Sequence, residues 1–266
     1  MDKTEAAACW EANAETWTRH VRAGYDVYRD ALNTPAFLAM LPPVRGLYGL
    51  DIGCGEGANT RKLAELGARM RGVDVAATFV RHAREAEMAR PLGVVYQVGD
   101  AAALPFADGS FDFVTAFMSL MDVAEQQQAL SEACRVLKPG GFLQFSILHP
   151  CFVPPHRRTL RDDRGDAYAV EIAGYFDERA GRIEEWWFST LPEEEKKRVP
   201  PFRVPRFHRT LSSWVDMICK AGFVIRRFGE PSASDAVAQA FPKVADTQVA
   251  GLFLHVQAAK PRNLSF

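Results

Sequence analysis

The stretch Leu50-Asp-Ile-Gly-Cys-Gly-Glu-Gly-Ala-Asn-Thr60 decides the fold of this chain. Three glycines alternate at positions 53, 55 and 57, directly after an apolar run that contains Asp51. Alternating glycines form a tight turn without Cβ atoms, so the backbone can approach a ligand closely. The polar pair Asn59-Thr60 then opens a predicted helix, whose free N–H groups favour an anionic group. The spacing G-x-G-x-G differs from the dinucleotide-binding pattern G-x-G-x-x-G.

A second acid, Asp74, ends the next apolar run, Met70-Arg-Gly-Val-Asp74. It lies about 20 residues past the glycines, where an acceptor for ribose hydroxyls is expected. Short apolar runs alternate with helical patterns around these two acids. The predicted strands are 47–52, 69–74, 94–98, 111–117 and 142–148, and the predicted helices are 58–66, 77–89 and 124–137. This alternation predicts an α/β fold with a parallel sheet, helices on both faces and a ligand beyond the carboxyl ends of the strands.

The regions outside this core have other patterns. Residues 1–44 are predicted to form a helical cap, because Trp10, Ala14 and Trp17 recur at helical spacing. The βα alternation stops at 149–209, where we expect an inserted substrate lid. Within it, 167–176 and 181–189 have strand composition and predict a hairpin. Residues 210–266 are expected to add a helix at 211–221 and closing strands at 223–228 and 251–258, completing a single domain over 1–266.

Four blocks together resemble the class I S-adenosylmethionine (SAM) dependent methyltransferases, in the small-molecule, type 11 branch near the quinone-biosynthesis enzymes. The blocks are LDIGCGEG at 50–57, GVDV at 72–75, GDAAALPFADGSFDFV at 99–114 and RVLKPGG at 135–141. The resemblance implies a Rossmann-like, doubly wound, mostly parallel seven-stranded sheet, with the helical cap before it and the lid after its fifth strand. It also implies SAM as the cofactor and S-adenosylhomocysteine as the product.

The resemblance assigns cofactor contacts residue by residue. It implies that Asp51, Gly53 and Gly55 hold the methionine end, and that Asp74 accepts from both ribose hydroxyls. Around the adenine it implies an acid for the amino group, a backbone N–H for the ring and an apolar wall, at Asp100, Ala101 and Val75. The Phe117 carbonyl is expected to meet the cofactor's amino group, and Tyr28 is the candidate lid residue over the cofactor.

The acceptor is expected to be a small, partly apolar molecule methylated at oxygen, nitrogen or carbon. Two histidines are candidate general bases, because an imidazole titrates near neutral pH. His149 follows the fifth predicted strand and His208 closes the lid segment. No H-x-x-x-H or paired Cys/His motif is present, so the sequence predicts no metal.

Composition sets the remaining expectations. The 266 residues carry a formal net charge of −1 and five scattered cysteines, and no apolar run reaches the roughly 18 residues that a membrane span needs. We therefore expect a cytoplasmic enzyme without a nucleic-acid or membrane partner, as a possible homodimer. A nucleic-acid methyltransferase and a SAM-binding scaffold without turnover remain alternatives, and a nicotinamide dehydrogenase is disfavoured by the glycine spacing.

Overall fold

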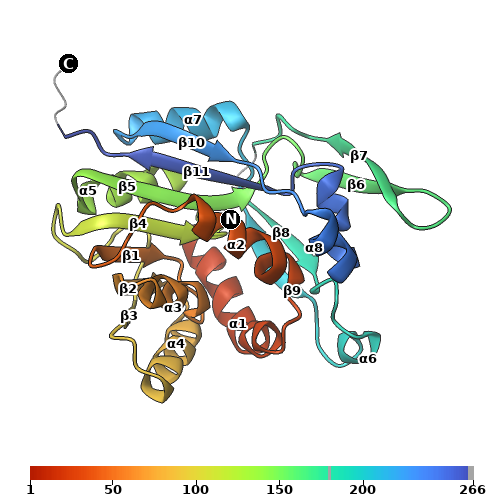
Figure 1. Ribbon diagram of the computed structural model, residues 1–266, viewed down its shortest axis with the longest axis horizontal. Helices are drawn as coiled ribbons and strands as arrows, with labels where there is room; N and C mark the ends of the chain where they lie inside the picture. The colour runs from red at the N-terminus through yellow and green to blue at the C-terminus, as the bar shows by residue number, and fades with distance from the viewer. Residues whose placement is uncertain (179–180, 263–266) are drawn as a thin grey trace.

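The computed structural model describes residues 1–178 and 181–262 and is built on one central sheet (Figure 1). The strand order is β10-β11-β5-β4-β1-β2-β3. Strands β1 to β5 are parallel, and β11 runs antiparallel to both β5 and β10. The bounds are β1 Tyr48–Ile52, β2 Arg69–Asp74, β3 Val95–Val98, β4 Phe111–Phe117, β5 Leu137–Leu148, β10 Val224–Gly229 and β11 Phe253–Ala259. The predicted seven-stranded, mostly parallel sheet is confirmed.

Helices cover both faces of the sheet, which makes the fold doubly wound (Figure 1). On one face α5 (Gln126–Val136) and α7 (Leu211–Lys220) bury Leu130 and Ile218 against strand residues such as Phe145. The opposite face is covered by α2 (Thr34–Met40), α3 (Ala58–Glu65) and α4 (Ala77–Ala89). Because β4 is covered on both sides, its side chains alternate between the two cores, with Val114 in one and Phe113 in the other.

The segment that follows β5 forms two hairpins that differ from the predicted one. Strand β6 (His156–Arg161) pairs with β7 (Ala167–Ala173), and β8 (Arg182–Trp186) pairs with β9 (Phe202–Arg206). The predicted pairing of 167–176 with 181–189 is therefore wrong. The reason is burial: β9 places Phe202 and Val204 in an apolar cluster with Trp186, whereas β7 has no buried residue to offer β8. The β6–β7 hairpin projects from the body of the molecule (Figure 1).

The helical cap is dominated by α1 (Lys3–Arg22), which packs against both α4 and β9. Asp2 caps this helix, accepting from the N–H groups of Thr4 at 2.8 Å and Glu5 at 2.9 Å. A carboxylate there satisfies N–H groups that have no partner within the helix. Near the middle of α1 the Asn13 side chain donates to Arg203 O at 2.9 Å, which holds the helix against β9.

Several elements were not predicted from the sequence. They are the π-helical turn η1 (Arg29–Asn33), the 3₁₀ turns η2 (Leu120–Asp122) and η3 (Pro242–Gln248), and the short helices α6 (Glu193–Lys196) and α8 (Asp235–Ala240). Strand β5 begins at Leu137, before the predicted 142–148, and therefore includes Pro139-Gly140-Gly141. None of the helices in the described ranges is both long and apolar enough to cross a membrane.

Candidate functional site

A cavity of about 740 Å³ lies at the carboxyl ends of β1, β2 and β4, beneath α1 and the β8–β9 hairpin. Parallel sheets bind their ligands at this edge, and the size suits a small-molecule site. All nine residues assigned to the cofactor line the cavity: Tyr28, Asp51, Gly53, Gly55, Asp74, Val75, Asp100, Ala101 and Phe117. The structure thus brings together residues that are up to about 90 positions apart in the sequence.

The glycine loop forms an open cradle in the wall of this cavity. Gly53 and Gly55 have φ values of +69° and +54°, in the left-handed region that side chains rarely adopt. A Cβ at Gly53 would meet the Ser119 Cβ at 2.4 Å, whereas a Cβ at Gly55 would have nothing within 4 Å and would enter the cavity. The loop therefore presents bare backbone at the place where the resemblance puts the methionine end of the cofactor.

Two buried acids flank the glycine loop. The Asp74 carboxylate accepts from the backbone N–H groups of Gly55 at 2.8 Å and Ala76 at 2.9 Å, and burial raises its pKa to about 6. Each carboxylate oxygen has a second lone pair, so the group can still accept from two hydroxyls. Asp51 accepts from Thr60 Oγ1 at 2.5 Å and Thr115 Oγ1 at 2.9 Å, and burial raises its pKa to about 7.

The remaining cofactor candidates are held by their neighbours. The Asp100 carboxylate accepts from Ala102 N at 2.8 Å and lies 3.5 Å from Lys3 Nζ. Phe117 packs on Phe37 with a ring-centroid distance of 3.9 Å. The Tyr28 hydroxyl lies 2.5 Å from the Lys243 carbonyl oxygen and 3.0 Å from an Asp246 carboxylate oxygen, and burial raises its pKa. Tyr28 is thus bonded to η3, and its role as a moving lid stays a prediction.

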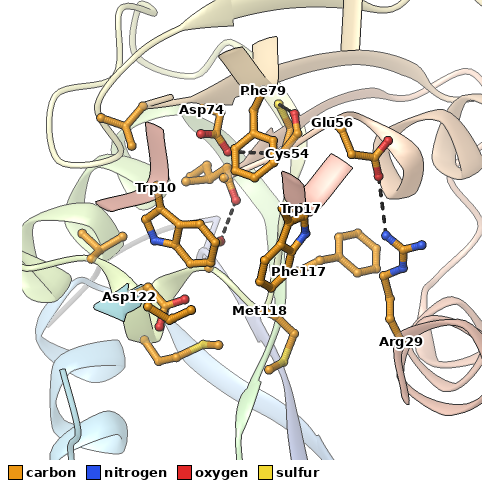
Figure 2. A pocket seen from close by; sticks show the side chains of 18 of the residues that line it. Trp10, Trp17, Arg29, Cys54, Glu56, Asp74, Phe79, Phe117, Met118 and Asp122 are labelled. Atoms are coloured by element: carbon orange, nitrogen blue, oxygen red, sulfur yellow. Dashed lines mark hydrogen bonds and ion pairs between the residues drawn. The ribbon is translucent and has the colours of Figure 1, made fainter. Parts of the chain in front are cut away.

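A second part of the cavity lining is aromatic. Trp10 and Trp17 of α1 meet edge to face with ring centroids 5.3 Å apart. Trp17 also packs on Phe188 at 4.9 Å and on Trp186 of β8 at 5.4 Å. We call the lining residues Trp10, Trp17, Trp186 and Phe188 the aromatic wall (Figure 2 labels the first two). A wall of this kind suits a partly apolar molecule, and its role in binding the acceptor stays a prediction.

One group of charged residues in the cavity was missed from the sequence. Asp122, Glu184 and Arg206 all line it, and we call them the polar corner. Arg206 Nε lies 3.5 Å from Asp122 Oδ1, and another guanidinium nitrogen lies 3.5 Å from Glu184 Oε2. Burial raises the pKa of Asp122 to about 7, although the Arg206 charge acts to lower it. The only sequence signal was an acid in the apolar run 118–123 directly after β4.

Neither candidate histidine lines the cavity. His149 Nε2 lies 2.7 Å from Glu230 Oε1, and its Nδ1 accepts from Cys151 N at 3.2 Å. His208 Nε2 lies 2.9 Å from the Tyr175 carbonyl oxygen, so this nitrogen carries the proton and donates it. Burial lowers the pKa of His208. The geometry offers neither ring a direct contact with a molecule in the cavity, and the general-base role stays a prediction that this placement disfavours.

Comparisons with known proteins agree with the site. Residues 50–145 match the family model described as a methyltransferase domain. The O-methyltransferase cnsE of Penicillium expansum is 38% identical over 117 residues, which are 42% of each chain. A demethylmenaquinone methyltransferase of Tropheryma whipplei is 37% identical over 136 residues, 50% of this chain and 56% of that one. The matches span about half the length of these curated relatives.

A solved structure extends the likeness beyond the core. The SAM-dependent methyltransferase from Mesorhizobium loti is 28% identical, with a TM-score of 0.68 over 85% of this chain and 96% of that one. The fold and site therefore define a class I SAM-dependent methyltransferase, and SAM is its cofactor. The match to the methyltransferase domain at 50–145 includes all four sequence blocks. Within residues 1–178 and 181–262, no three His, Cys, Asp or Glu side chains cluster in a way that suits a metal ion.

Proposed function

We propose that this chain transfers the methyl group of SAM to a small, partly apolar acceptor and leaves S-adenosylhomocysteine. One observation carries the proposal: a single cavity joins the glycine loop and its acids to the aromatic wall. A methyl donor and an apolar acceptor could therefore occupy neighbouring positions without crossing a protein barrier. Methyl transfer is an in-line displacement, and holding the two reactants side by side removes much of its barrier.

Bound SAM would supply a methyl group activated by the sulfonium. The chain's own residues would hold it and keep water out. Asp74 would accept from the ribose hydroxyls, and the bare backbone at Gly53 and Gly55 would receive the methionine end. The aromatic wall would cover the methyl group with apolar surface, which strengthens electrostatic interactions inside the cavity.

The test is a methyl-transfer screen with labelled SAM against fractionated small molecules, followed by mass spectrometry of the labelled product. We expect label in a small-molecule fraction. Label in RNA would instead support a nucleic-acid methyltransferase, which the net charge of −1 disfavours. Calorimetric binding of SAM without transfer to any fraction would support the scaffold alternative. Size measurement by light scattering would test the proposed homodimer.

The lid proposed at 149–209 can be divided by deletion. Replacing β6–β7, residues 156–173, by a short Gly/Ser linker should leave SAM binding and methyl transfer within about twofold, because no residue of these strands lines the cavity. Replacing 182–206 should abolish transfer, because that segment carries Trp186, Phe188 and Arg206. A protein without 182–206 that still methylates efficiently would show that the acceptor binds elsewhere.

A further inference from the structure

In the part of the chain that the structure describes, the buried charged groups of the polar corner lack hydrogen-bond partners at some of their atoms. The Asp122 side chain is 4% exposed, and its buried Oδ1 has no hydrogen-bond partner among the described residues. Its contact with Arg206 Nε, at 3.5 Å, is an ion pair that is too long for a good hydrogen bond. Buried charges are costly unless they are paired and hydrogen-bonded. An acidic group left in this condition in a cavity wall points to a ligand that donates to it.

The charge of the whole cavity shows which kind of ligand fits. Among the described lining residues there are seven carboxylates and three cations. Each cation is already paired with a lining carboxylate: Lys3 with Asp100, Arg29 with Glu56 and Arg206 with Asp122, all at 3.5 Å. An anionic acceptor would find no unpaired cation and an excess of negative charge. A cationic acceptor would be attracted by this excess of negative charge.

Aromatic faces lie next to this excess of carboxylates. Glu184 and Trp186 alternate along β8 and therefore share a face, and both line the cavity. In the view of Figure 2, Trp10 lies between the carboxylates of Asp74 and Asp122, and Trp17 lies beside Trp10. Tryptophan faces attract cations through the ring quadrupole, whereas an uncharged hydroxyl gains nothing comparable.

We propose that the acceptor is an amine on an apolar body, and that its nitrogen binds at the polar corner with Asp122 as the proton acceptor. This inference rests on the proposed function and names its substrate class. The ammonium would donate a hydrogen bond to Asp122. The ion pair of Glu184 with Arg206 would lie beside it.

The proposed step is balanced as follows. The ammonium gives one proton to the Asp122 carboxylate and becomes a neutral amine with a free electron pair. That pair forms the N–CH₃ bond while the CH₃–S bond breaks, and the bonding electrons leave with sulfur as a thioether. The nitrogen becomes a methylated ammonium, and the Asp122 proton returns to solvent. No oxidant, reductant or metal is needed.

The test uses matched compounds that share one body and differ in one group. The two triplets are 2-phenylethylamine, 2-phenylethanol and phenylacetate, and tryptamine, tryptophol and indole-3-acetate. Binding is measured by calorimetry to the full chain saturated with S-adenosylhomocysteine. We expect the amine to bind at least about tenfold more tightly than the alcohol, and the carboxylate most weakly, because charge-assisted hydrogen bonds are the stronger ones. If the amine does not bind most tightly in either triplet, or if no member binds, the inference is wrong.

Substitutions of Asp122 and Glu184 test whether the preference for the amine arises at the polar corner. Asp122→Asn should weaken the amine by about tenfold or more and the alcohol by less than about threefold. Glu184→Gln should weaken the amine by a smaller factor. The matched control is Glu171→Gln on the exposed strand β7, which should change nothing. Equal losses for amine and alcohol in a folded Asp122→Asn protein would indicate a merely structural acid and overturn the assignment.

A pH series adds a readout that does not depend on turnover. Since Asp122 faces Arg206 from β9 and Glu184 from β8, and burial raises its pKa to about 7, amine affinity should rise as the pH passes from 6 to 8. Asp122→Asn should flatten that rise. S-adenosylhomocysteine affinity, measured in parallel, separates the two proposals: if it is absent the proposed function fails, and if it is normal only the amine inference is at stake.

Discussion

The glycine-loop side and the aromatic side of the cavity are assembled in different ways. The first depends on contacts within residues 51–115, such as those of Asp51 in β1 with Thr60 in α3 and Thr115 in β4. The second joins distant segments, as in the contacts of Asn13 with Arg203 and of Asp122 with Arg206. The comparison predicts that cofactor binding depends mainly on contacts within residues 51–115, whereas acceptor binding depends on packing between α1 and the β8–β9 hairpin.

The largest effect should come from breaking that packing. Trp17→Ala removes a ring that contacts Trp10, Trp186, Phe188 and Phe202. Large aromatic truncations of this kind cost about 3 kcal/mol of folding stability. Chemical denaturation should show that loss, and calorimetry at low temperature should show SAM affinity changed by less than about fivefold. An equal collapse of SAM binding would mean that the two sides are not separable.

The glycine-loop side can be broken on its own with Asp74→Ala. Losing an acceptor for two hydroxyls should weaken SAM binding by roughly 1–3 kcal/mol while the fold survives. Asp100→Ala should weaken it less, because the Ala101 backbone and the apolar walls remain. Titration calorimetry measures both, with thermal melting as the folding control. Unchanged affinity in a folded Asp74→Ala protein would show that the ribose site has been misplaced.

The ionisation of Asp122 in the polar corner should make the free energy of unfolding depend on pH. Burial raises the pKa of Asp122 to about 7 from its usual 3.8, so the folded state keeps a proton that the unfolded state has lost, and stability falls as the pH rises from about 4 to about 7. Asn carries no such charge. As the pH rises from 5 to 8, stability should therefore shift in favour of Asp122→Asn over the wild type, by on the order of 1–3 kcal/mol. A pH-independent difference in urea denaturation would mean that Asp122 has an ordinary pKa.

The smallest expected effect is the change in turnover when His149 or His208 is replaced. If either were the general base, its replacement by Ala would lower turnover by about 10²-fold with SAM affinity kept. Because both rings lie outside the cavity wall and are bonded to Glu230 and to the Tyr175 carbonyl, we expect less than about threefold loss for either variant. Turnover under saturating SAM decides between these outcomes.

The sheet was predictable because its signals are local. The runs before the glycine loop and before Asp74 specify buried strands by their apolar residues, and β4 has the predicted bounds Phe111–Phe117. The cofactor candidates came from the resemblance of the sequence blocks to known methyltransferases, and the parallel strands bring their carboxyl ends to the edge where these residues lie. The hairpins after β5 were not predictable, because strand composition does not say which partner buries more surface. Glu184 and Arg206 gave no signal for the same reason: each is an ordinary charged residue until β8 and β9 pair beneath α1.

The two ends of α1 are held by unlike forces, and this bears on how long a ligand stays bound. Lys3 in its first turn lies 3.5 Å from Asp100 and 3.4 Å from Glu125, and these ion pairs are largely exposed. Trp17 near its other end is held by apolar packing. Salt screens exposed ion pairs and leaves apolar contacts in place. Residence time should therefore shorten with ionic strength while the fold persists, and ligands should leave past the first turn of α1.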